Sequence, residues 1–197
     1  MRQRLVRSPV PFPIRAAVLV AAVLAGIGAA GATIRVELTF DPPTVSHGAD
    51  GSVLLAAPGC VTFNEPGLPL LPARRAVVLL PPGETVTAIR VVPEGVHAIE
   101  GRHLVAPAQR QVPIGTVGPH PRTEPDPSVY GSDALYPAAA ARLVTEQKGW
   151  GHGLAYLRVS PVSYRPALGA LSWYERVIVE VDTALPEGAD ALSVPRL

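Results

Sequence analysis

Proline and glycine are so frequent in this chain that it has little room for long helices. The 197 residues include 23 Pro and 18 Gly, roughly a fifth of the chain, against about 12% in an average soluble protein. Proline removes a backbone donor and glycine costs backbone entropy, so both interrupt helices. Because 48% of the residues are hydrophobic, the chain can still bury a core. This combination favours many short strands joined by turns.

Several segments show the period-two alternation of a half-buried strand. The pattern is clearest in residues 176–182, and residues 34–40 share it. Shorter runs predict further strands at residues 52–55, 74–80, 85–92, 154–159 and 172–174. We therefore predict an all-β domain, an antiparallel sandwich or barrel-like domain of short strands.

Turn residues predict how these strands connect. Residues 81–84, Pro-Pro-Gly-Glu, have good turn chemistry, so the strands at 74–80 and 85–92 should form a hairpin. A turn is also expected at residues 47–51. Another is expected at residues 164–169, which would make the last strands a meander.

Two segments depart from this β pattern. Residues 107–127 contain six prolines and predict a long irregular loop, a kind of segment that often carries function. Residues 137–146 are the one place where a short helix is expected, because good helix formers gather there.

Residues 1–32 have the layout of a secretory signal peptide. Four arginines and no acidic residue accompany an uncharged apolar run at residues 16–30, and Ala30-Gly31-Ala32 gives the small-x-small cleavage pattern. A membrane span needs about 20 strongly apolar residues, and this run is shorter and rich in alanine and glycine. An uncleaved N-terminal anchor is therefore the less favoured alternative. We expect a signal-peptide helix at 1–32, a domain at 33–183 and a C-terminal linker at 184–197, with the protein secreted or in the cell envelope.

The single cysteine does not indicate catalysis. Cys60 lies between strand-like segments without a neighbouring base, and free cysteines are commonly buried and inert. A hydrolase that uses Cys60 is the remaining alternative. Glu94, Glu100, Glu124 and Asp126 lie in apparent turns and form no evident acid–base pair.

The five histidines lack the spacing of a helical metal site. His97 and His103 could meet across a hairpin, although two solvated loop residues are the simpler interpretation. His152 lies in a glycine-rich run that could hold a ligand, or that begins a bulged strand. We therefore expect no metal and no cofactor. A net charge of +1 gives no indication of nucleic acid as a partner.

Two blocks of residues carry a more specific pattern. The first is Pro66-Gly67-Leu68-Pro69-Leu70-Leu71-Pro72, followed by an apolar strand and a Pro-Pro-Gly turn. The second runs from Leu135-Tyr136-Pro137 through Gly149-Trp150-Gly151 to residues 157–171. The positions that define the two blocks are Gly67, Pro69, Leu71, Pro72, Pro81, Gly83, Tyr136, Pro137, Pro161, Tyr164, Pro166 and Gly169. In this order they resemble the N-terminal propeptide of gingipain-type, caspase-like cysteine peptidases, over most of residues 33–182.

The resemblance implies a β-sandwich that assists folding of a peptidase domain with a His–Cys dyad and covers its active-site cleft until it is cleaved. In the family, a basic side chain on a propeptide loop can occupy the specificity pocket of enzymes that cut after Arg or Lys. Arg110 and Arg122 are the candidates in the irregular stretch. We favour Arg110, which lies between two glutamines; a solvated loop arginine is the alternative.

No peptidase domain follows before Leu197, so we expect either a fragment of a longer precursor or a stand-alone propeptide-like protein. The expected partner is a cognate cysteine peptidase domain, in cis or in trans. We expect a monomer that has no catalytic residues and does not bind nucleic acid. After signal cleavage it should have no stable membrane anchor. The alternative is a stand-alone exported β-sandwich that acts as an adhesion or ligand-binding module.

Overall fold

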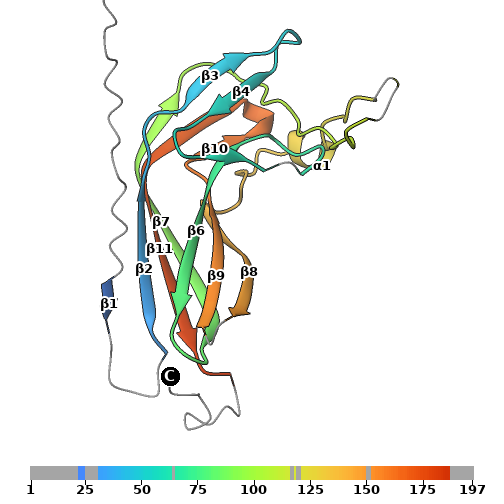
Figure 1. Ribbon diagram of the computed structural model, residues 1–197. Helices are drawn as coiled ribbons and strands as arrows, with labels where there is room; N and C mark the ends of the chain where they lie inside the picture. Colours follow the sequence, from blue (N-terminus) through green and yellow to red (C-terminus); the bar gives the residue numbers. More distant parts are fainter. Residues whose placement is uncertain are drawn as a thin grey trace, which may run out of the picture.

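The computed structural model describes residues 31–63, 65–115, 118, 121–149 and 152–186, together with the backbone of residues 22–24. In these parts of the chain the structure is mostly β, and every pair of neighbouring strands is antiparallel. Two open sheets face each other, and neither closes into a barrel (Figure 1). The predicted all-β, sandwich-like fold is confirmed.

The first sheet is organised around one long strand, β11. Its members are β1 (Ala22–Leu24), β2 (Thr33–Thr39), β7 (Thr85–Ile99), β10 (Val162–Arg165) and β11 (Ala170–Ala184). β7 pairs along almost all of one edge of β11, and β2 and β10 share the other edge. β1 pairs with the far edge of β2. The strands predicted at 172–174 and 176–182 are therefore one continuous strand.

The second sheet has four strands in the order β5-β6-β9-β8. Their bounds are β5 (Val61–Thr62), β6 (Pro72–Leu80), β9 (His152–Val159) and β8 (Ala141–Gly149). A separate hairpin of β3 (Thr44–His47) and β4 (Val53–Ala56) lies at one end of the sandwich (Figure 1). The turn expected at residues 47–51 is the turn of this hairpin.

The main core lies between the two sheets. Val177, Val179 and Val181 on β11 are fully buried, and they pack with the alternating apolar residues of β2, β6 and β9. Each such valine contributes about 1.5–3 kcal/mol by leaving water. A smaller cluster at the end near the β3–β4 hairpin is built around Tyr164, which is also fully buried. The predicted alternation in residues 34–40 and 176–182 is confirmed.

The hairpin predicted from residues 74–92 is wrong. The turn itself forms, with the Glu84 amide donating to the Pro81 carbonyl at 3.1 Å. However, it crosses from one sheet to the other, because β6 pairs with β9 and β7 pairs with β11. The crossing lets the apolar faces of β6 and β7 pack into one core instead of lying side by side in one sheet.

The helix predicted at residues 137–146 is also wrong. Residues 141–149 form β8, which pairs with β9, and the Ala141 side chain is buried in the core. Pairing with β9 outweighs the helix propensity of the alanines, which is a weak preference. Among the described residues, the α-helix is the single turn α1 (Pro127–Tyr130), capped at its N-terminus by the Asp126 side chain.

Three smaller expectations also change. The last strands are not a simple meander, because β9 and β10 are consecutive in the chain but lie in different sheets. Glu94 lies within β7 and not in a turn. Gly149 and His152 pair across the end of the β8–β9 hairpin, while the bulge lies further along β8, between Leu143 and Thr145.

Most of the expected signal peptide, residues 1–21 and 25–30 with the cleavage-site residue Ala30, lies outside the described residues, as do residues 187–197. Residues 22–24 form the strand β1 and not part of a helix. Within the described chain, no helix has the length and hydropathy to cross a membrane.

Candidate functional site: the loop between β7 and α1

The irregular segment that joins β7 to α1 is built into the fold at its beginning. Residues 104–108 lie between β4 on one side and residues 67–70 on the other. The Val53 amide donates to the Leu104 carbonyl at 2.7 Å, and Ala106 donates back to Val53 at 2.9 Å. On the opposite side, Ala108 donates to Leu68 at 2.8 Å. This arm behaves as a short central strand, and it fixes where the loop leaves the sandwich.

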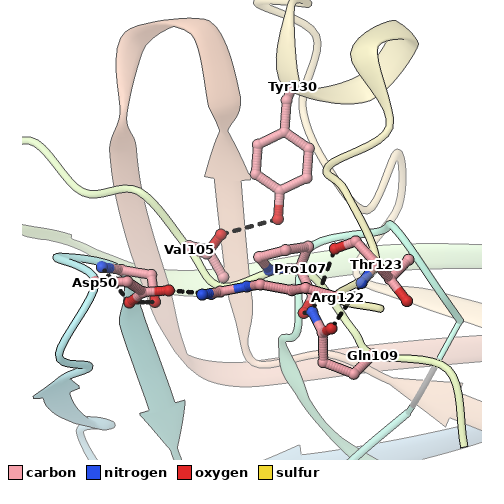
Figure 2. A network of polar contacts seen from close by, with 8 residues as sticks. Asp50, Val105, Pro107, Gln109, Arg122, Thr123 and Tyr130 are labelled. Carbon is pink, nitrogen blue, oxygen red and sulfur yellow. Dashed lines mark hydrogen bonds and ion pairs between the residues drawn. The ribbon is translucent and has the colours of Figure 1, made fainter. Parts of the chain in front are cut away.

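Two tyrosines clamp the same arm. The Tyr164 hydroxyl donates to the His103 carbonyl at 2.9 Å and accepts from the Val105 amide at 3.4 Å. The Tyr130 hydroxyl, on α1, donates to the Val105 carbonyl at 2.8 Å (Figure 2). Burial raises the pKa of Tyr164, and burial followed by the neighbouring tyrosines raises the pKa of Tyr130. Both hydroxyls therefore remain protonated donors across the physiological pH range.

The two arms of the loop are tied together further out, at a neck formed by Gln109, Arg110 and Thr123. The Thr123 amide donates to the Gln109 side chain at 2.9 Å, and the Arg110 amide donates to the Thr123 hydroxyl at 3.0 Å. The Gln109 side chain also donates to the Pro107 carbonyl at 2.9 Å (Figure 2). The described residues beyond this neck are 111–115, 118, 121 and 122, and the described part of the loop projects from one end of the sandwich (Figure 1).

The two candidate arginines lie at the neck, Arg110 within it and Arg122 next to Thr123, but their surroundings differ. Arg122 forms an ion pair with Asp50 in the β3–β4 turn (Figure 2). The hydrogen bond from the Ser52 hydroxyl, and then the one from Arg122, lowers the pKa of Asp50, so this carboxylate stays charged. Arg110 is exposed, and its guanidinium makes no hydrogen bond or ion pair with the described residues. Arg110 is therefore the arginine that is available to a partner.

An open groove of about 1430 Å³ separates the loop from the β3–β4 hairpin. Asp50, Leu54, Arg110, Val112 and Arg122 are among its lining residues. Its walls come from segments that are far apart in the sequence, and no sequence pattern predicts that they meet. Asp50, Gln109 and Thr123 are not among the predicted site residues. The high proline content of residues 107–127 was the one sequence signal for this region.

The residues with possible catalytic or metal-binding chemistry remain apart. Within the described part of the chain, no cluster of His, Cys, Asp and Glu could hold a metal ion. His97 stacks on Trp173 and pairs with Glu175, whereas a ring nitrogen of His103 contacts the Glu100 carbonyl at 2.9 Å. The possible pairing of His97 with His103 is not what the structure shows.

Cys60 is half-buried. Desolvation raises the pKa of its thiol, with Arg74 opposing that shift. A raised pKa disfavours the thiolate that a nucleophile requires. The surroundings of Cys60 therefore resemble those of an inert structural cysteine.

The glycines of the two sequence blocks occupy conformations that suit glycine. Gly67, Gly83 and Gly169 have φ angles of 86°, 80° and 65°. A Cβ at Gly67 would lie 3.3 Å from the Glu124 carbonyl, and one at Gly169 would lie 2.5 Å from the Arg102 side chain. The Gly67 amide also donates to the Ala108 carbonyl at 2.9 Å, so this block holds the base of the loop.

Apart from Pro81, which lies at the opposite end of the sandwich, the other positions of the blocks support the same end of the fold. Tyr136 exchanges two backbone hydrogen bonds with Tyr164, at 2.7 and 2.8 Å, and a cis peptide bond joins it to Pro137. Pro72 and Pro161 are fully buried, and Leu71 packs in the smaller core. Among the remaining members, Pro69 lies at an isolated bridge with Pro107. Pro81 lies in the β6–β7 turn, and Pro166 begins the 3₁₀ turn before β11. These residues shape the scaffold that presents the loop.

Solved structures were found with the same arrangement of strands. The chain is similar to one from the complex of Porphyromonas gingivalis RgpB pro- and mature domains, with a TM-score of 0.62, 17% identity and 89% of each chain covered. It is also similar to a structure on the zymogenic latency of gingipain K from Porphyromonas gingivalis, with a TM-score of 0.61 and 16% identity over 87% of this chain and 96% of that chain.

A scan against protein-family models and a search of curated proteins gave no match. The structural likeness extends over nearly the whole chain. It concerns gingipains, the same peptidases whose propeptide the two sequence blocks resemble. The chain therefore has the fold of these gingipain zymogen structures, as expected for a gingipain propeptide-like domain.

Proposed function

We propose that this chain is the latency domain of an exported gingipain-like cysteine peptidase. It would bind the peptidase domain, assist its folding and cover its active-site cleft until it is removed. The single observation that carries this proposal is the fold likeness, over 89% of the chain, to a chain in a complex of pro- and mature domains. The signal-peptide layout of residues 1–32 supports the export.

The loop beyond the neck is the part of the domain suited to enter a cleft. Its base is held by hydrogen bonds on both sides and by two tyrosine hydroxyls, so little conformational entropy remains to be lost there on binding. Arg110 lies at the neck, and its exposed guanidinium has no ion pair among the described residues. An enzyme that cuts after basic residues has a pocket for such a group, and Arg110 would fill it.

The test is inhibition of a mature gingipain by the full 197-residue chain and by an Arg110→Ala variant. A buried arginine at the centre of an interface contributes at least about 2 kcal/mol, which corresponds to about 30-fold in affinity. We expect Arg110→Ala to weaken inhibition by at least that factor. Arg35→Ala serves as the control, because Arg35 is also exposed but lies on β2, facing away from the core.

Full inhibition by the Arg110→Ala variant would remove Arg110 from the mechanism. Failure of the unmodified chain to bind any gingipain would contradict the proposed function itself. It would favour a binding module that shares only the fold.

A further inference from the structure

The two outer faces of the sandwich differ in chemistry. The outer face of the first sheet carries a ladder of ion pairs across its strands. Arg90 on β7 pairs with Glu180 and Asp182 on β11 at 3.2 Å each, and Arg176 pairs with Glu37 on β2 at 3.0 Å. Such cross-strand pairs of opposite charge stabilise a sheet, and β7 also exposes Val92 and Val96.

The outer face of the second sheet is apolar at its centre. Val77 on β6 lies opposite Tyr156 on β9, and Leu79 lies opposite Leu154. Val77 is 47% exposed and Leu79 is 59% exposed, and on β8 Val144 is 53% exposed. Contiguous exposed apolar side chains bordered by polar ones mark interaction surfaces on soluble proteins.

A row of arginines borders this apolar centre. Arg75, Arg158 and Arg142 lie opposite one another across β6, β9 and β8. The Glu65 carboxylate bonds to Arg142 at 2.8 Å and also to Arg158. Arg75 stacks over the Phe63 ring at 5.4 Å but has no ion pair with the described residues. One carboxylate thus pairs with two of the three guanidinium groups, which leaves the row positive.

Like charges directly opposite each other destabilise a sheet on their own. The Glu65 carboxylate and the Phe63 ring, which contacts both Arg75 and Arg158, offset part of this repulsion. The positive charge that remains suits carboxylates on a partner, and Arg75 and Arg142 are the exposed members of the row. A hollow beside it, lined in part by Arg142 and Arg158, has a volume of about 40 Å³. That is far below the roughly 300 Å³ of a small-molecule site, so the face suits a protein surface.

The arginine row lies at the end of the sheet that adjoins the loop. Glu65, which bonds to Arg142 and Arg158, precedes Gly67 by two residues, and the Gly67 amide donates to the Ala108 carbonyl in the loop arm. In Figure 1 the loop and α1 project from the same end of the sandwich at which β6 begins. A single partner can therefore contact the loop and this face together.

We propose that the outer face of β6, β9 and β8 is a second docking surface for the peptidase domain. It takes a partner surface with an apolar centre, packed on Val77 and Leu79, and with carboxylates facing the arginine row. This inference rests on the proposed function. It adds a second contact, which the peptidase domain would make with a surface outside its own active-site cleft. Rim charges of this kind act mainly on the association rate and on salt dependence.

The test measures binding of the full chain to mature RgpB and to mature gingipain K. A Val77→Thr/Leu79→Thr double variant keeps strand-forming residues but removes the apolar centre, and we expect it to bind at least 10-fold more weakly. Val92→Thr is the matched control, because Val92 is also 47% exposed but lies on β7 in the other sheet. Its affinity should remain within about 2-fold.

An Arg75→Glu variant tests the charge independently. Because Arg75 has no ion pair to lose within the described chain, the fold should tolerate the reversal. We expect a lower association rate, with a difference from the unmodified chain that shrinks as salt screens the charges. If the double variant fails to fold, Arg75→Glu carries the test.

The outcomes separate the two proposals. Unchanged binding of both variants, together with weaker binding of Arg110→Ala, would overturn the second docking surface and leave the proposed function intact. No binding by the unmodified chain would overturn both. A dimer of the chain that dissociates in the Val77→Thr/Leu79→Thr variant would assign the face to self-association and would also overturn the inference.

Discussion

Removing the hydroxyl of Tyr164 should destabilise the domain at the base of the loop. Tyr164 is fully buried, and its hydroxyl is the group that joins the smaller core to the loop arm. It donates to the His103 carbonyl at 2.9 Å and accepts from the Val105 amide at 3.4 Å. A Tyr164→Phe change keeps the ring and its packing, so the change isolates these two hydrogen bonds.

The expected loss follows from what the change leaves behind. Val105 is itself fully buried, and a buried backbone group without a partner costs about 1–3 kcal/mol. We expect the free energy of unfolding to fall by about 2 kcal/mol, the middle of this range. The loss should not be larger, because the hydrogen bond from the Val105 amide is long and therefore weak. For a domain of this size, that corresponds to a drop of about 4–8 °C in Tm.

Urea unfolding of the full chain measures the effect, with the m-value checked to be unchanged. Tyr156→Phe is the control, because the Tyr156 side chain lies on the outer face of the second sheet. Faster amide exchange at Val105 should accompany the loss of stability. A decrease below about 0.5 kcal/mol would refute the reasoning, because a surface substitution has an effect of that size.

Two further predictions concern the same end of the fold. Gly169→Ala should cost more stability than Gly51→Ala, because both residues have positive φ angles, 65° and 78°, but only the Cβ at Gly169 would meet neighbouring atoms, at 2.5 Å; equal losses in urea unfolding would contradict this. The pKa values of Tyr130, Tyr136 and Tyr164 are raised, chiefly by burial. The unfolded chain therefore loses these protons near pH 10 while the folded domain keeps them, so stability is complete below about pH 10 and falls above it. Tyrosinate absorbance of these residues that appears well before unfolding would argue against it.

Local patterns in the sequence predicted the faces of the strands but not their partners. The alternation at Val177, Val179 and Val181 depends on neighbours two residues apart, so it can be read directly, and these side chains are fully buried. The turn at residues 81–84 is equally compatible with a hairpin and with a crossing between sheets. Its role is decided by β9 and β11, which lie far away in the chain. Long-range pairing with β9 likewise makes residues 141–146 part of strand β8, although the sequence predicted a helix at 137–146.

The candidate site shows the same division. The density of prolines predicted the irregular loop, and Arg110 and Arg122 could be singled out as its basic residues. Their different surroundings could not be predicted, because Arg122 pairs with Asp50 from a turn that is distant in sequence. The tyrosine clamp likewise joins Tyr130 and Tyr164 to Val105 across long separations. Such contacts depend on the assembled topology and have no local signature.

The central claim is that this chain is a latency domain, and its most direct test is a competition assay. The full chain is titrated into a mature gingipain, and hydrolysis of a peptide substrate with a basic residue before the cleaved bond is measured. We expect inhibition at micromolar concentration or below, competitive with substrate, and at least about 30-fold weaker for Arg110→Ala. A chain that is folded by circular dichroism, yet neither binds nor slows the peptidase at these concentrations, would contradict the account.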